Sequence, residues 1–210
     1  MKEEQDYSRD IADIRSMMER SSKFGSLSGW AGIMAGIYAL AGAYIAWKVL
    51  NFQPTEIVDV DISTATVDLL FNLLPVFFLA IGILVLAGST ALFFSYKRAN
   101  KRGEKLWNAT SRRLLVNMAV PLITGGLLIL ILISKGMIGL IAPLTLLFYG
   151  LALYNASKFT YEEVRILGII QIILGLISAN FVEYGLLIWA VGFGIVHIIY
   201  GIYIHYKYER

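Results

Sequence analysis

The chain has 210 residues, of which 58% are hydrophobic and 16% are charged, and its formal net charge is +3. About a quarter of the residues in a soluble globular domain are charged, so this is not the composition of a soluble protein. The absence of cysteine excludes disulfides, thiolate metal sites and cysteine nucleophiles.

Long apolar runs recur along the chain, and a run of about 18 residues or more predicts a membrane-spanning helix. We therefore predict an all-α integral membrane protein with six spans, arranged as three antiparallel hairpins. The third and fourth spans are separated by only three residues, so these two are expected to be antiparallel neighbours. The predicted spans are residues 27–50, 67–96, 114–133, 137–156, 161–180 and 184–206.

Residues 1–26 precede the first span and are rich in charge. Within residues 3–23, apolar side chains recur at helical spacing on one face, which predicts a short amphipathic helix. Acidic residues are about as frequent as basic ones in this segment, which disfavours a helix lying on the lipid surface. We predict a cytosolic helix that docks on protein and offers a site for a cytosolic partner. Its apolar stripe consists of Tyr7, Ile11, Ile14 and Met18.

Residues 97–113 contain seven Lys and Arg residues and are predicted to form a basic cytosolic loop. The segment is short and matches no nucleic-acid-binding motif, so we expect contact with anionic lipid headgroups and no nucleic-acid partner. With six spans, all basic residues except Lys48 and Lys135 fall on one side of the membrane. By the positive-inside rule, both termini are expected to be cytoplasmic.

The first span is rich in small residues that recur on one face of the predicted helix. Such a groove marks helix–helix contact in lipid, where association depends on close packing. The groove serves either packing within the monomer or self-association. It consists of Gly32, Gly36, Ala39 and Ala43.

The last two spans each carry one polar residue among small ones, and these residues are our candidate intramembrane polar site: Gln171 and His197. The fifth span is expected to open with a capping box over residues 160–163. Glycines flank both polar residues and extend the predicted helix-packing face: Gly168, Gly175, Gly194 and Gly201.

Two interpretations of His197 remain open. Because His197 and Gly168 lie almost equally far along the chain from the turn at Val182, they are expected at one depth in the membrane. His197 is then either a neutral imidazole, packed against Gly168 and bonded to a backbone carbonyl or to Gln171, or a titrating group in a pathway or in a pH-responsive contact. His205 lies eight residues further on, about 12 Å away, which is too far to share a metal ion.

The interiors of the predicted spans contain no Asp, Glu, Lys or Arg, and the chain matches none of the common catalytic or phosphate-binding motifs. We therefore expect no enzymatic activity, no cofactor and no metal. An ion-coupled transporter commonly relies on an intramembrane carboxylate, so that class is disfavoured as well.

The C-terminal part resembles the hairpin repeat of the HdeD-like membrane proteins. The resemblance rests on Gly168-Ile-Ile-Gln-Ile-Ile-Leu-Gly175, a short turn, the glycines at 185, 192 and 194, and Tyr200-Gly201-Ile202. It implies six spans in three hairpins, a bacterial cytoplasmic membrane and a role in acid-stress resistance. The chain departs from the repeat where a proline often ends the first helix, because residues 179–181 are Ala-Asn-Phe.

Two functions follow as hypotheses. In the first, the chain is a non-enzymatic interaction or stress-response protein that forms homo-oligomers in the lipid membrane. In the second, it is a small channel or passive transporter with a path past Gln171 and His197.

Overall fold

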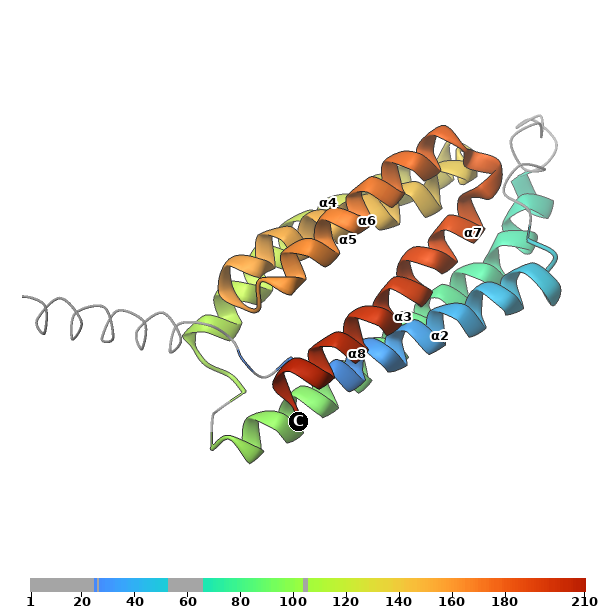
Figure 1. Ribbon diagram of the computed structural model, residues 1–210. Coiled ribbons are helices and arrows are strands. Elements are labelled where there is room, and N and C mark those ends of the chain that lie inside the picture. The colour runs from blue at the N-terminus through green and yellow to red at the C-terminus, as the bar shows by residue number, and fades with distance from the viewer. Residues whose placement is uncertain (1–24, 26, 53–65, 104–105) are drawn as a thin grey trace, which may run out of the picture.

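The computed structural model describes residue 25 and residues 27–52, 66–103 and 106–210, with the backbone alone for residues 66–72. The described residues form helices and turns and contain no strand. Six of the helical segments are long and apolar enough to cross a membrane. The prediction of an all-helical chain with six such helices is confirmed (Figure 1). The predicted amphipathic helix lies outside the described residues, as does most of the connection between the first two spans.

The first four spans are nearly continuous helices. They are α2 (Gly29–Lys48), α3 (Thr66–Lys101), α4 (Ala109–Ser134) and α5 (Ile141–Ala156), the last flanked by the 3-10 turns η1 (Ile138–Leu140) and η2 (Ser157–Phe159). The fifth span is α6 (Glu163–Asn180). After the turn η3 (Val182–Tyr184), the sixth span consists of α7 (Gly185–Trp189), the π-helical segment η4 (Ala190–Val196) and α8 (His197–Tyr208). We call the continuous segment from Gly185 to Tyr208 the C-terminal helix.

The predicted bounds of the basic loop, residues 97–113, are wrong at both ends. Helix α3 continues to Lys101, and α4 already begins at Ala109. Helix α3 ends just before Gly103, whose φ of +67° lies in the left-handed region that favours glycine. A capping box starts α4: the Asn108 side chain accepts a hydrogen bond from the backbone N–H of Ser111, and the Ser111 hydroxyl accepts one from the N–H of Asn108. Most of the basic side chains are therefore carried on helical turns.

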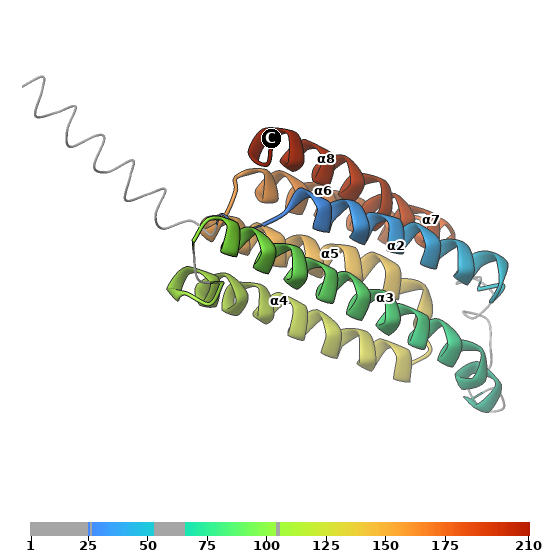
Figure 2. The ribbon, with the colours of Figure 1, turned by 90° about the horizontal axis from the view of Figure 1, so that it is seen from below.

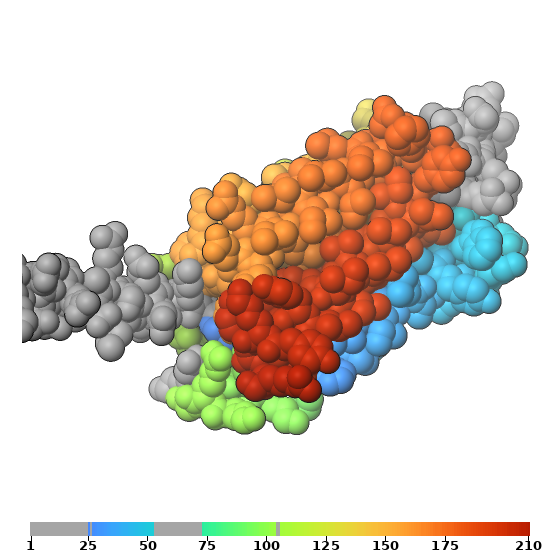
Figure 3. Space-filling model, viewed as in Figure 1, coloured from blue at the N-terminus to red at the C-terminus, as the bar shows by residue number. Residues whose placement is uncertain are grey.

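The helices form two groups that meet along the C-terminal helix (Figure 1). The view from below shows that the long helices of both groups run in roughly the same direction along the bundle (Figure 2). In one group α5 packs against α4 and α6. In the other, α2 packs against α3 and against the C-terminal helix, which also contacts α5 and α6. The space-filling view shows α6, α8 and α2 on one face of the molecule (Figure 3).

Glycines bring α2 and the C-terminal helix into backbone contact. A Cβ added at Gly36 would lie 2.6 Å from the carbonyl oxygen of Gly194, and one added at Gly201 would lie 2.5 Å from that of Gly29. Added at Gly32, it would lie 3.1 Å from the Cα of Gly201. The groove that the sequence predicts on the first span is therefore filled by the chain's own C-terminal helix. Its two alanines, Ala39 and Ala43, are buried too.

A second glycine contact joins α6 to α5. A Cβ at Gly168 would lie 2.8 Å from the carbonyl oxygen of Gly150, and one at Gly175 would lie 2.9 Å from that of Pro143. The expected packing of Gly168 against His197 is wrong. Residues three apart on a helix point about 60° away from each other, so Gly168 faces α5 while Gln171 faces the C-terminal helix.

Helices α3 and α4 differ from the other four in their exposure. None of the residues in the most apolar stretch of α3 is buried, and in α4 the share is 6%, compared with 28–39% in the other spans. Helix α3 packs chiefly on α2, and α4 chiefly on α5. Both helices therefore present long apolar surfaces that no other part of the described chain covers.

Candidate functional site

Both predicted polar residues lie in the interior, where α5, α6 and the C-terminal helix meet. Gln171 on α6 is fully buried, and His197, the first residue of α8, is 5% exposed. The structure brings the two side chains together and adds two residues that the sequence analysis did not assign to the site, Tyr149 on α5 and Gly192 in η4. We call these four residues the Gln171 cluster.

The hydrogen bonds of the cluster, together with its burial, determine which nitrogen of the imidazole carries the proton. His197 Nδ1 lies 2.9 Å from the carbonyl oxygen of Gly192, and because a carbonyl only accepts, Nδ1 carries the proton. Burial disfavours a charged imidazolium, so Nε2 carries no proton and accepts from the Tyr149 hydroxyl at 3.0 Å. The imidazole is neutral, and both of its nitrogens are bonded.

The Gln171 amide shares the same carbonyl. Its Nε2 donates to Gly192 O at 2.8 Å, so both lone pairs of that oxygen receive side-chain donors. The amide nitrogen also lies 3.4 Å from His197 Nδ1, but both atoms are donors aimed at one acceptor. Of the two partners that the sequence analysis left open for His197, the backbone carbonyl is the one that the geometry supports.

Gly192 is required by the shape of the cluster. A Cβ at this position would lie 2.6 Å from Leu146 Cδ2 and 2.8 Å from Gln171 Oε1. Gln171 Oε1 is buried and has no hydrogen-bond partner among the described residues. The side of Gly192 that would carry a side chain thus faces this oxygen.

Aromatic rings cover the imidazole. The Phe193 ring stacks on His197 with centroids 5.7 Å apart, and Tyr149 lies 5.0 Å from Phe193. Trp189 follows at 5.0 Å on the other side of Phe193. The described residues contain no group of three or more His, Asp or Glu side chains that would hold a metal ion. The arrangement therefore favours a structural polar core that joins three helices.

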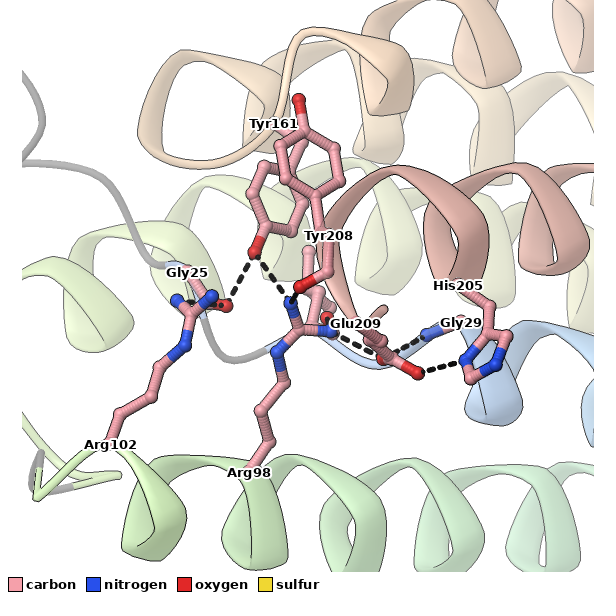
Figure 4. A network of polar contacts seen from close by, with 9 residues as sticks. Gly25, Gly29, Arg98, Arg102, Tyr161, His205, Tyr208 and Glu209 are labelled. Carbon is pink, nitrogen blue, oxygen red and sulfur yellow. Dashed lines mark hydrogen bonds and ion pairs between the residues drawn. The ribbon is translucent and has the colours of Figure 1, made fainter.

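A second polar cluster joins the ends of several helices at one end of the bundle (Figure 4). Arg98, near the end of α3, forms an ion pair with Glu209 and donates to the carbonyl oxygens of Leu27 at 2.8 Å and Tyr208 at 2.9 Å. The side chains of Arg98 and Glu209 are only 10% and 13% exposed. We call this group the Arg98 network.

The Arg98 network also holds the segment that leads into α2. Glu209 accepts from the backbone N–H of Gly29 at 2.8 Å and from His205 Nδ1 at 2.6 Å. The carbonyl oxygen of Gly25 accepts from the Tyr161 hydroxyl at 2.6 Å and from Arg102 at 3.0 Å. These contacts thus hold the segment before α2 against the end of α3 and the C-terminal end of α8, although the three segments are far apart in the sequence.

Burial alone would raise the pKa of the Glu209 carboxyl. Hydrogen bonds from His205, Gly29 and Ser28, together with the positive charge of Arg98, outweigh the burial and hold the pKa of Glu209 below its usual range. Glu209 is therefore ionised whenever the protein is folded near neutral pH.

The fifth span begins two residues later than predicted, and the capping box over residues 160–163 stays a prediction. Helix α6 begins at Glu163, and its N-cap residue, Glu162, makes no capping bond with its side chain. The Glu163 carboxylate instead accepts from Lys207 and from the Tyr208 hydroxyl, at 3.0 Å for the latter. An ionic contact thus joins the start of α6 to the end of the C-terminal helix.

Comparisons of the chain with protein-family models, with curated proteins and with solved structures find no match. The resemblance to the HdeD-like proteins therefore stays a prediction.

We expect Tyr149→Phe to destabilise the protein by about 1–3 kcal/mol, because it leaves the buried Nε2 of His197 without a donor. Thermal unfolding in lipid nanodiscs measures the effect. Tyr154→Phe on the same helix is the control, since the Tyr154 ring is 36% exposed. Equal unfolding temperatures for both variants would contradict the assigned bond.

The Arg98 network predicts a loss of stability in acid. A carboxyl whose pKa is lowered by folding stabilises the protein above its unfolded pKa, about 4.3, and this contribution disappears as the pH falls through the folded pKa. Unfolding temperatures measured from about pH 5 to pH 3 should fall, and Glu209→Gln should flatten the fall. Glu183→Gln, in the exposed turn η3, should leave it unchanged. The prediction fails if the two variants behave alike.

Proposed function

We propose that the chain is a non-enzymatic, six-span membrane protein that self-associates in the bacterial cytoplasmic membrane and serves in interaction or stress response. The observation that carries the proposal is the contrast in exposure between the helices. In the most apolar stretch of α3 none of the residues is buried, and in that of α4 6% of them are. In the other four spans the share is 28–39%. In lipid, an interface between copies of the chain would use these two uncovered helices.

The use of the glycines supports this choice of surface. The surfaces at Gly36 and Gly168 are already covered by helices of the same chain. They cannot contact a second copy unless the monomer unpacks. Gly82 and Gly88 on α3 and Gly126 on α4 have nothing within 4 Å of an added Cβ. These exposed small residues leave room for a neighbouring helix to approach the backbone.

The distribution of polar contacts supports the proposed orientation, with both termini cytoplasmic. The Arg98 network gathers the end of α3, the entry to α2 and the C-terminus at one end of the bundle, next to exposed Lys97, Lys101 and Arg102. Basic residues favour the cytoplasmic side. The contacts of α2 with α3, of α4 with α5 and of α6 with the C-terminal helix support the proposed arrangement as three hairpins. A cytosolic partner would dock on residues 3–23.

The second candidate is a channel or passive transporter whose path passes Gln171 and His197. The closeness of these two polar side chains in the interior favours it. Their burial and their bonds to Gly192 disfavour it, because a path needs groups that can exchange partners with water or a solute. Flux into proteoliposomes that Gln171→Leu abolishes would replace the first proposal with this one.

Self-association is tested by single-molecule photobleaching of the labelled protein in lipid vesicles over a range of protein densities. We expect Gly82→Leu and Gly126→Leu to raise the dissociation constant about tenfold or more, because each side chain fills space that a second copy would occupy. A Cβ added at either position meets no other atom of the monomer within 4 Å.

Ala179→Leu is the matched control, because Ala179 is exposed on α6, away from α3 and α4. It should leave the dissociation constant unchanged. The proposal is contradicted if the protein is a monomer at every density. It is also contradicted if Gly82→Leu and Gly126→Leu leave the dissociation constant of the oligomer unchanged.

A further inference from the structure

Basic side chains gather where α3 ends and α4 begins. Lys97 and Lys101 lie one turn apart near the end of α3, and Arg112 and Arg113 lie near the start of α4. All four are exposed, and the ion pairs among the described residues use other cations. Trp107, in the connection between the two helices, is 66% exposed. We call these five residues the basic surface.

The two arginines of this surface lie where a helix disfavours positive charge. The first N–H groups of a helix give its N-terminal end a partial positive charge. The first turn of α4 contains no acidic residue that would offset this charge. A carboxylate placed against this end would interact favourably with Arg112, with Arg113 and with the helix dipole. The basic surface therefore favours an acidic partner.

The N-terminal segment of the chain starts beside this surface. The carbonyl oxygen of Gly25 accepts a hydrogen bond from the Arg102 side chain at 3.0 Å, which fixes it next to the end of α3 (Figure 4). Leu27 packs against the hydrophobic cluster that contains Leu114 of α4. Residues 1–24 are therefore tethered at the two helices that carry the basic surface.

The helix predicted for residues 3–23 has an acidic stripe next to its apolar stripe. Carboxylates recur at spacings of three, four and three residues, so they share one side of this predicted helix: Glu3, Asp6, Asp10 and Asp13. At the helical period, the face opposite the apolar stripe carries basic residues instead: Arg9, Arg20 and Lys23. The predicted helix thus combines acidic and apolar groups on one side and keeps its cations on the other.

The acidic stripe and the basic surface complement each other. Anionic headgroups repel the acidic stripe, so lipid is a poor cover for the apolar stripe beside it. Trp107 offers an apolar cover next to the cations. Asp13 precedes Gly25 by 12 residues, which is about 18 Å along a helix. A tether this short gives the segment an effective concentration on the order of millimolar at the basic surface, so that even a weak contact is populated.

We propose that residues 3–23 dock on the basic surface of their own membrane domain. The acidic stripe meets the four cations, and the apolar stripe meets Trp107. A cytosolic partner of residues 3–23 then binds only after it displaces this segment, so the contact is autoinhibitory. It goes beyond the proposed self-association and does not require it, because the tether joins the segment to the surface of the same chain.

The test is a distance measurement within one chain. Because the chain has no cysteine, spin labels can be attached at Ala12→Cys and at Ala109→Cys, an exposed position at the start of α4. Double electron–electron resonance is recorded in nanodiscs of neutral lipid, with an excess of unlabelled protein so that only distances within one chain contribute. We expect a narrow distance distribution.

Charge reversal and its rescue identify the contact. Asp10→Lys with Asp13→Lys should broaden the distribution about twofold or more, because like charges then face each other. Adding Lys97→Glu and Lys101→Glu to that variant should restore the narrow distribution. Arg9→Glu with Arg20→Glu is the matched control. It changes the charge by the same amount on the opposite face of the predicted helix and should leave the distribution unchanged.

A broad distribution in the chain without charge reversals overturns the proposal. A distribution that is narrow only when the nanodiscs contain anionic lipid overturns it as well, because the segment then docks on the membrane. The same holds if Asp10→Lys with Asp13→Lys has no more effect than the control, or if the reversed lysines do not rescue it. The photobleaching experiment measures self-association separately, so the two proposals can fail independently.

Discussion

The close backbone contact between α2 and the C-terminal helix is the constraint on which the rest of the structure depends. Lipid tails are as apolar as the helices, so the association of helices in a membrane requires near-contact of their surfaces. The glycine pairs Gly36–Gly194 and Gly29–Gly201 provide it, and they join the first described helix to the last. Because the C-terminal helix is fixed in this way, its rotation and depth are fixed as well.

Both polar clusters depend on that placement, since the C-terminal helix carries His197 in one, and Glu209 of the other follows directly after its last residue. At mid-helix, the π segment carries the Gly192 carbonyl that accepts from Gln171 and His197. π-helical segments are uncommon. Their turns contain more residues than those of an α-helix, so the side chains in and after the segment point in different directions than they would on a regular α-helix. At the helix end, Glu209 meets Arg98. Bonds within these two clusters thereby hold the helices together, and the uncovered surfaces of α3 and α4 remain for contact with lipid or another copy.

Hydropathy was sufficient to predict the six helices, because an apolar run of sufficient length has few other uses. Residue spacing also predicted that Gly32 and Gly36 face another helix, and that Gln171 and His197 lie close in the interior. The position of a residue along the chain predicts its depth in the membrane but not the direction in which its side chain points around the helix axis. The prediction that Gly168 packs against His197 failed for this reason, because Gly168 faces α5. Tyr149 and the Arg98–Glu209 pair had no local signal, because their partners lie 48 and 111 residues away.

The most direct measurement of the central claim compares Gly36→Ala with Gly88→Ala in thermal unfolding of the purified protein in nanodiscs. An added methyl at Gly36 meets Gly194 O at 2.6 Å, whereas at Gly88 it meets nothing within 4 Å. We predict that Gly36→Ala lowers stability by about 1–3 kcal/mol through overpacking, while Gly88→Ala leaves it unchanged or raises it through helix propensity. Unchanged stability of Gly36→Ala would contradict the backbone contact between α2 and the C-terminal helix.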